Sequence, residues 1–244
     1  MKNNYFKSAF ILGGTSTIAQ SICIKLAENG CKRFHLVSRN PAANKKLIEK
    51  LRIFYNAEVT IEKNDLLLNT SLVDKFKPKV DFYEIYLIAP GLIGNNDLAN
   101  SNAKEALKIN SVNYAGILPW LIEIMTEKRI KFKGSLWVLS SVAADRGRPS
   151  NYHYGASKAA LSVFCEGLLL RCANKPFSVR IIKAGYISSP MSAGAPKFLC
   201  TSPNKVASIL IRDPYKRGIE YIPWWWNLIM FLVQRLPSYL AAKL

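Results

Sequence analysis

Residues 8–16 read SAFILGGTS, a short apolar run that ends in two glycines and two hydroxyl-bearing residues. The run has the length and composition of a buried strand, and apolar residues recur at helical spacing over 18–26 until Gly30 closes that segment. A helix that begins directly behind a strand presents free backbone N–H groups to an anion, and Gly13 and Gly14 let the backbone approach that anion closely. The stretch therefore predicts the first βα unit of an α/β domain. Its turn is either a dinucleotide-binding loop or a plain tight turn.

Strand-like and helix-like segments alternate along the rest of the chain at the lengths typical of βα units. Further strands are expected at 34–37, 59–61, 84–89, 135–139, 178–183 and 218–222. Helices are expected between them at 47–54, 72–76, 103–128, 154–172 and 205–211. This alternation predicts a doubly wound parallel sheet of about seven strands with helices on both faces. We expect one such domain over 1–218, with a long loop at about 188–203, followed by the last strand and a hydrophobic tail over 219–244.

The composition limits the classes of protein that the chain can belong to. Its 244 residues, half of them hydrophobic, are enough for one domain with a sizeable core. The formal charge of +18 suits nucleic acid, an anionic membrane surface or phosphorylated small molecules. The cations form no run of five and no zinc-finger spacing occurs, so we expect neither nucleic-acid binding nor a metal site. Five cysteines without a CxxC pair, and no signal peptide, indicate reduced thiols and a cytoplasmic protein.

A second informative stretch is Tyr154-Gly155-Ala156-Ser157-Lys158. A Tyr and a Lys four residues apart lie one turn apart on the same face of a helix. An ammonium close to a phenol favours the phenolate, so this pair could exchange a proton near neutral pH. Such pairs also occur by chance on many helices, and the pentapeptide alone leaves that alternative open.

Together with its neighbours, this pentapeptide resembles the short-chain dehydrogenase/reductase family. That family combines a Gly-rich first turn with an Asn, a Ser, a Tyr and a Lys in this order. The sequence offers Asn113 in Asn-Tyr-Ala-Gly, Ser141 after the fifth strand, and then Tyr154 and Lys158. Ser141 precedes Tyr154 by 13 residues, which is the usual spacing of the family. The resemblance covers roughly residues 8–192 and implies a Rossmann-type fold.

The chain departs from the family pattern at three backbone positions. These are Thr17 and Ala19 in place of glycines in the first turn, Ala89-Pro90-Gly91 in place of Asn-Ala-Gly, and Ala184-Gly185 in place of Pro-Gly. They affect the geometry of the cofactor site more than the chemistry.

The resemblance implies a role for each of the four residues. Tyr154 would give a proton to a carbonyl oxygen as hydride arrives from a nicotinamide, and Lys158 would lower the pKa of Tyr154 and hold the ribose hydroxyls. Ser141 would hydrogen-bond the substrate oxygen, and Asn113 would hold a water that relays protons behind Lys158. As alternatives, Ser141 could be a cap or turn residue and Asn113 an ordinary polar helix position.

The end of the second expected strand bears on the choice of cofactor. An acid there would bind the adenine ribose hydroxyls, but the chain has Ser38-Arg39-Asn40. Arg39 could hold a 2′-phosphate, or it could merely stack on the adenine. We therefore expect NADP(H), with NAD(H) as the alternative. The resemblance implies that Asp65 and Leu66 contact the adenine and that Ile187 and Ser189 contact the nicotinamide carboxamide. With these, the expected cofactor contacts are Gly13, Gly14, Thr15, Ser16, Thr17, Ile18, Arg39, Asp65, Leu66, Ala89, Gly91, Tyr154, Lys158, Ile187 and Ser189.

Two further features concern the substrate. The loop over 191–201 should cover it, and Lys197, Arg146 and Arg148 either face a phosphate on the substrate or are ordinary surface charges. The tail over 221–236 reads YIPWWWNLIMFLVQRL, an apolar run too short to span a bilayer. Its tryptophans and flanking cations suit a segment at a membrane interface, whereas the alternative is burial in a dimer interface or against the core.

The chain is most similar to one branch of the family, the decaprenylphosphoryl-2-keto-erythro-pentose reductases. The shared features are the Gly-Gly-Thr-Ser turn at 13–16, the Lys-Ala-Gly-Tyr at 183–186 and the Trp-rich tail. This resemblance implies reduction of a polyprenyl-phosphate-linked keto-pentose in cell-envelope arabinose synthesis, at the inner face of the cell membrane, with a flavin-dependent oxidase as partner. It also implies a homo-oligomer built through the helices at 103–128 and 152–172. The alternatives are a reductase of another lipid carbonyl (3-keto-sphingoid or 3-ketoacyl) and a non-catalytic dinucleotide sensor.

Overall fold

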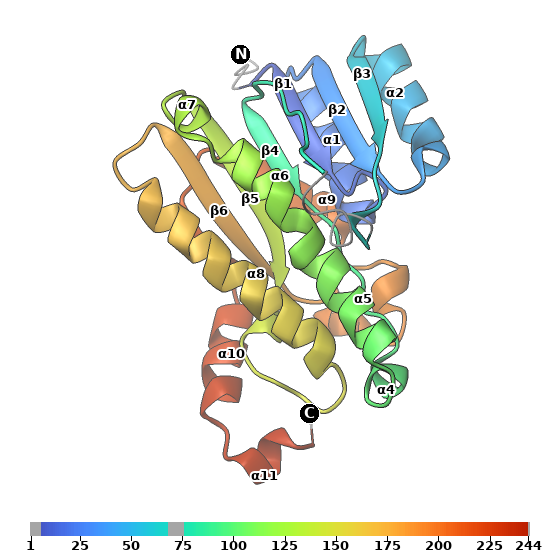
Figure 1. Cartoon of the computed structure of the whole chain (residues 1–244), viewed down its shortest axis with the longest axis vertical. Helices are drawn as coiled ribbons and strands as arrows, with labels where there is room; N and C mark the ends of the chain where they lie inside the picture. The colour runs from blue at the N-terminus through green and yellow to red at the C-terminus, as the bar shows by residue number, and fades with distance from the viewer. Residues whose placement is uncertain (1–5, 68–75, 244) are drawn as a thin grey trace.

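The computed structural model describes residues 6–67 and 76–243, which form a parallel sheet between two layers of helices (Figure 1). Within these residues the sheet has seven strands in the order β3-β2-β1-β4-β5-β6-β7, and each neighbouring pair is parallel. The strands are β1 (Ser8–Leu12), β2 (Arg33–Ser38), β3 (Glu58–Lys63), β4 (Ile85–Ile88), β5 (Gly134–Ser141), β6 (Phe177–Ala184) and β7 (Gly218–Ile222). The strand order reverses at β1 and β4, where such sheets open a crevice at the carboxyl ends of their strands. The predicted fold class is confirmed.

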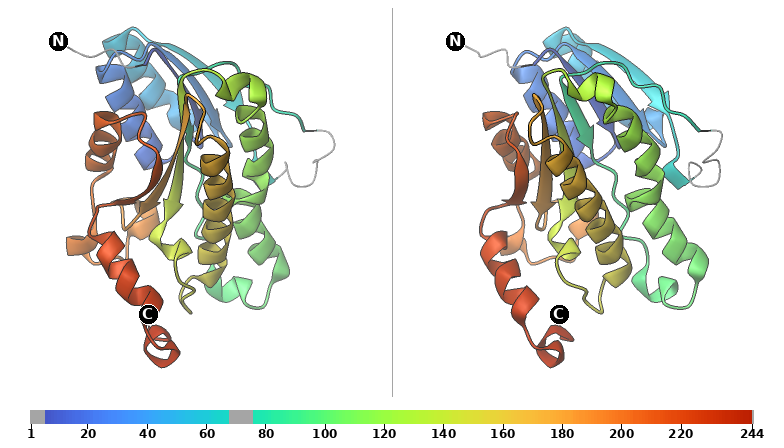
Figure 2. Two further views of the ribbon diagram at one scale, coloured as in Figure 1. Left: turned by 90° about the vertical axis from the view of Figure 1, so that its left-hand side faces the viewer. Right: turned by 60° about the vertical axis from the view of Figure 1, so that its left-hand side comes forward.

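The two helical layers are distinct in Figure 2, with α1, α2 and α9 on one face of the sheet and α5, α6 and α8 on the other. The helices are α1 (Thr17–Glu28), α2 (Lys45–Tyr55), α4 (Asn96–Ala99), α5 (Ala103–Asn113), α6 (Leu118–Ile124), α7 (Glu127–Ile130), α8 (Tyr152–Arg171), α9 (Pro203–Arg212), α10 (Trp226–Arg235) and α11 (Ser238–Ala241). Successive strand residues point to opposite faces, so Ala9 and Ile11 join the core beneath α1 while Phe10 and Leu12 join the core beneath α6 and α8.

The single long helix predicted over 103–128 is wrong. The helix stops at Asn113, because Tyr114 leaves the helical region with φ −143° and ψ −71°, and α6 starts only at Leu118. Gly116 explains the break, since a Cβ there would lie 2.1 Å from the carbonyl oxygen of Leu66. The backbone at this break lies against the segment after β3, where only glycine fits. The helix predicted at 72–76 lies outside the described residues except for Phe76, which is not helical.

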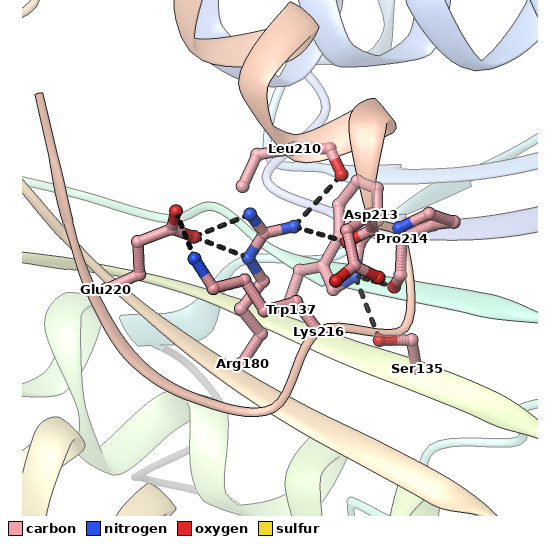
Figure 3. Close-up of polar contacts among 8 residues, drawn as sticks. All are labelled: Ser135, Trp137, Arg180, Leu210, Asp213, Pro214, Lys216 and Glu220. Carbon is pink, nitrogen blue, oxygen red and sulfur yellow. Dashed lines mark hydrogen bonds and ion pairs between the residues drawn. The ribbon is translucent and has the colours of Figure 1, made fainter. Parts of the chain in front are cut away.

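A buried cation joins β6, β7 and the end of α9 (Figure 3). The Arg180 side chain is 1% exposed, and its Nε and Nη2 donate to Oε2 of Glu220 at 2.8 and 2.5 Å. Its Nη1 donates to the carbonyl oxygens of Leu210 and Asp213 at 2.9 and 3.0 Å. A buried charge is tolerated when it is paired and its donors are satisfied, so this cluster fixes the last strand and the segment that leads to it.

The tail forms α10 and α11 at the end of the molecule where the strands finish (Figure 1). One face of α10 is buried, with Trp226 and Met230 packed on Val142. The opposite side is open to solvent, and its exposed apolar residues are Leu228, Phe231 and Leu232. Among the described residues, no helix combines the length and apolarity that crossing a membrane requires.

Candidate active site

A cavity of about 490 Å³ opens at the carboxyl ends of the central strands, and it collects most of the residues that the sequence singled out. The predicted site residues that line it are Gly13, Thr15, Ser16, Thr17, Ile18, Arg39, Asp65, Leu66, Ala89, Gly91, Ser141, Tyr154, Lys158, Ile187 and Ser189. Gly14 and Asn113 are not among the lining residues, and both lie behind its wall.

The first turn of the chain is held tightly against the sheet. Gly13 has φ +84°, and a Cβ there would lie 2.7 Å from the Pro90 nitrogen, so only glycine fits. The N–H groups of Gly13 and Gly14 both donate to the Val37 carbonyl, at 2.9 and 3.1 Å. Helix α1 then begins with Ser16 at its N-cap, without a side-chain cap and without an acid in its first turn. This uncapped helix N-terminus faces the cavity wall and is suited to a pyrophosphate.

The end of β2 supplies the second part of a dinucleotide site. Arg39 is exposed and lines the cavity. The adjacent Ser38 is buried, and its Oγ accepts a hydrogen bond from Nδ2 of Asn44 at 3.1 Å. Asn44 is itself fully buried, and its Oδ1 has no hydrogen-bond partner among the described residues. The free oxygen lies close to the first turn, because a Cβ on Gly14 would be 3.8 Å from it.

Ser141 and Tyr154 meet at the floor of the cavity. Ser141 is the last residue of β5, and its Oγ accepts from the Ala143 N–H at 3.1 Å. Burial raises the pKa of Tyr154, and a hydrogen bond with the Ser141 side chain lowers it by less. The lowering of the Tyr154 pKa by Lys158 that the family resemblance implies stays a prediction. The phenol stays protonated at neutral pH, which is the form that can donate a proton.

Lys158 lies one turn further along α8 and is 2% exposed. Its Nζ donates to the carbonyl oxygens of Pro90 and Leu139 at 2.9 and 3.0 Å. Burial disfavours the ammonium and lowers the pKa of Lys158 to about 8. The lysine thus ties the ends of β4 and β5 together and places a cation at the cavity floor.

Asn113 acts on the loop after β4. Its Oδ1 accepts from the Leu92 N–H, and its Nδ2 donates to the Leu92 carbonyl, both at 2.8 Å. The side chain is fully buried, so its amide is engaged with this backbone rather than turned toward Lys158. The Asn113 amide thus holds the loop that forms part of the cavity wall, and its role in a water relay stays a prediction.

The three cations that the sequence placed near the substrate have different positions. Arg148 lines the cavity. Arg146 is turned toward the tail, where it donates to the carbonyl oxygens of Gln234 and Leu236 at 3.0 and 3.3 Å. Lys197 is exposed and does not line the cavity. Only Arg148 can therefore meet a ligand in the cavity without rearrangement.

The tail packs against the loops that form the cavity. A Cβ on Gly185, which lines the cavity, would lie 1.8 Å from Nε1 of Trp226. Trp226 and Met230 also cover Val142, the residue that follows Ser141. Behind them, Asp145 accepts from Lys183 at 2.5 Å and from the Tyr221 hydroxyl at 2.9 Å. The tail thus supports the backbone on either side of the cavity floor.

Sequence reasoning missed Asn151 and Trp226. Asn151 lines the cavity at the N-cap of α8. Its position three residues before Tyr154 could have indicated that it lies near the site. Trp226 lay in a stretch that suggested membrane contact, and nothing local indicated that it packs on Gly185.

Comparison with known proteins identifies the family. A family model described as short chain dehydrogenase matches residues 7–198. The chain belongs to the short-chain dehydrogenase family. An uncharacterised oxidoreductase of Streptomyces coelicolor, encoded in the mprA 5′ region, is 28% identical over 242 residues, covering 98% of this chain and 96% of the relative.

Solved structures of two other enzymes share the fold. A 7β-hydroxysteroid dehydrogenase superimposes with a TM-score of 0.75 at 19% identity, over 90% of this chain and 88% of the other. An actinorhodin polyketide ketoreductase solved with NADPH superimposes with a TM-score of 0.70 at 17% identity, over 87% of this chain and 91% of the other. The chain is thus an oxidoreductase of the NAD(P)-dependent type that acts on CH–OH or C=O groups. The narrow first turn and the uncapped α1 fit a dinucleotide in the cavity.

Proposed function

We propose that this short-chain dehydrogenase is a carbonyl reductase with Tyr154 as proton donor. The observation that carries the proposal is the convergence of Ser141, Tyr154 and Lys158 on one cavity that also contains the dinucleotide turn. A bound nicotinamide would supply the hydride. A tyrosine phenol is protonated at neutral pH, so the Tyr154 hydroxyl can give a proton to the developing alkoxide. Ser141 orients that hydroxyl and donates to the same oxygen.

Lys158 has two roles in this scheme. Its ammonium holds the loop carbonyls of Pro90 and Leu139, and it stabilises negative charge as the Tyr154 proton leaves. Asn113 fixes the loop through Leu92, so the cavity wall keeps its shape during turnover.

NADP(H) is the proposed cofactor in preference to NAD(H). Arg39 is exposed at the cavity rim and no acid stands beside it, so it can pair with a 2′-phosphate. An acidic residue at this point would repel that group.

For the substrate, we propose a keto-pentose linked to a polyprenyl phosphate, in cell-envelope arabinose synthesis. A sugar is supported by the polar side chains of Ser141, Arg148 and Asn151, which line the same cavity as Tyr154. A site for a fatty ketone, such as a 3-ketoacyl or 3-keto-sphingoid group, would need few such groups. The keto sugar would come from a separate flavin-dependent oxidase, and the protein would work as a homo-oligomer.

The tail is proposed to hold the protein peripherally at the inner face of the cell membrane. Its outer side exposes Leu228, Phe231 and Leu232, and Arg235 follows within the same helix.

The membrane proposal is best tested with surface substitutions, because removing the tail would also uncover Val142. Leu232→Ser should reduce binding to phosphatidylglycerol vesicles, whereas Leu107→Ser, at a leucine on α5 with 66% exposure against 64%, should not. Equal losses of vesicle binding in the two variants would contradict the membrane proposal.

The reductase proposal is tested with Tyr154→Phe, assayed as ketone-dependent oxidation of NADPH. Turnover should fall by about a thousandfold or more, a range typical for loss of a general acid together with its hydrogen bonds. Binding of NADPH, followed by calorimetry, should persist. Tyr152→Phe is the matched control, since Tyr152 lies on the same helix and bonds Asn100 instead. Turnover of Tyr154→Phe close to that of the control would refute the assignment.

A further inference from the structure

Two polar groups on the substrate side of the cavity have no partner. Nε of Arg148 and Oδ1 of Asn151 are both buried, and neither has a hydrogen-bond partner among the described residues. Both residues line the cavity that contains Tyr154. Burying an unpaired polar atom costs about 1–3 kcal/mol, so a protein that keeps two of them in a cavity wall has a ligand or solvent to pair them.

The position of Asn151 makes its free amide unusual. It is the N-cap of α8, and an asparagine at that place ordinarily accepts a hydrogen bond from the first turn. Here the side chain makes no cap hydrogen bond, and the helix has no acid in its first turn. The helix N-terminus therefore keeps its positive partial charge next to the cavity, and the Asn151 side chain lines the cavity without being tied to the helix.

The charge around Arg148 is also uncompensated. Its guanidinium forms no ion pair with any acid in the described part of the chain. Asp145 is the nearest acid along the sequence, and it is engaged by Lys183 and Tyr221. Arg146 is engaged by the tail, so Arg148 is the cation that this loop directs to the cavity.

We propose that Arg148 and Asn151 form a substrate subsite for an anionic, hydroxylated carbonyl compound. The guanidinium and the N-terminus of α8 take a phosphate group, and the Asn151 amide takes a hydroxyl of the substrate. A ketone with only an alkyl chain would leave both groups unpaired and bind poorly. This inference rests on the proposed reductase function and assigns the phosphate and one hydroxyl of its substrate to two particular residues.

The test compares a matched pair of ketones, ribulose 5-phosphate and ribulose, in binding and in reduction with NADPH. The wild-type protein should bind the phosphorylated ketone at least tenfold more tightly, measured by calorimetry on the NADPH complex. Arg148→Met keeps the apolar stem and should abolish this preference, whereas Arg148→Lys should keep part of it. Lys197→Met is the control, because it removes an exposed cation outside the cavity and should leave the preference intact. Asn151→Ala should weaken both ketones alike, since it removes a contact to a hydroxyl that both carry.

The two proposals can fail separately. No preference for the phosphorylated ketone in the wild type, or a preference that survives Arg148→Met, overturns the subsite, while Tyr154-dependent reduction of ribulose would still support the reductase. Phosphate-dependent binding that Arg148→Met abolishes supports the subsite even without turnover. Competition by inorganic phosphate or by phosphatidylglycerol micelles distinguishes a free phosphate from a lipid-borne one.

Discussion

Replacing Gly185 by alanine should separate the tail from the cavity wall. The added Cβ would lie 1.8, 2.3 and 2.4 Å from Nε1, Cε2 and Cδ1 of Trp226, all far inside van der Waals contact. No rotation of a methyl group relieves this overlap, so the indole must leave. Trp226 is 5% exposed and Met230 is 1% exposed in the docked tail. Losing a buried tryptophan contact costs about 3–5 kcal/mol, and partial relaxation of the backbone reduces that figure.

We therefore expect Gly185→Ala to lower the free energy of unfolding by about 2–4 kcal/mol, and the melting temperature by roughly 4–16 °C for a chain of this size. Thermal unfolding measures the loss directly. Limited trypsin digestion should show faster cleavage after Arg235, because the undocked helix opens more often. Ketone reduction should fall as well, since Gly185 and the neighbours of Ser141 lose their support.

Gly194→Ala provides the control on the same loop. A Cβ at Gly194 meets nothing within 4 Å, so its effect on stability should stay within about 0.5 kcal/mol. Gly185→Ala could instead have the same melting temperature as Gly194→Ala, with no faster cleavage of its tail. Trp226 would then not pack against Gly185, and the tail would not support the cavity wall.

Three more predictions concern single charges. Burial lowers the pKa of Lys158 from 10.5 to about 8, so between these pH values the unfolded chain binds the proton more tightly and the free energy of unfolding should rise with pH. Compared with Lys158→Met in urea titrations, this rise should be on the order of 3 kcal/mol. If the free energies of unfolding of the two proteins vary with pH in parallel, the shift is refuted. Arg39→Ala should raise the KM for NADPH about tenfold or more but leave that for NADH nearly unchanged, and equal effects would overturn the cofactor preference. Arg180→Met leaves the Glu220 carboxylate with Lys216 alone and should lower the free energy of unfolding in urea by about 3 kcal/mol. Adding Glu220→Leu should restore most of this loss. A double variant as unstable as the single one would contradict this account.

The two sides of α10 have different surroundings. One side holds the loop after Ser141, and the other exposes apolar side chains. Under the proposal that α10 contacts a lipid surface, the exposed side would make this contact while the buried side stays packed on the loop. A lipid-linked substrate would then meet the cavity beside this helix.

The sequence by itself determined the α/β fold and most of the cavity. Alternating strand and helix segments specify a parallel sheet, and residues at the ends of its strands must meet at one edge. This is why Gly13, Ser141 and Ile187 could be placed together before the structure was known. The sequence spacing of Tyr154 and Lys158 likewise places both on one helix face without any tertiary contact.

Tertiary contacts decided the rest. The helix after Ala103 breaks because Gly116 must pass the carbonyl of Leu66, a contact that no local pattern contains. Arg146 and Arg148 are two residues apart with the same chemistry, yet the first bonds a tail some 90 residues away and the second enters the cavity. Periodicity fixes which face of an element is buried, but which partner a long polar side chain reaches depends on segments brought beside it only by the folded chain.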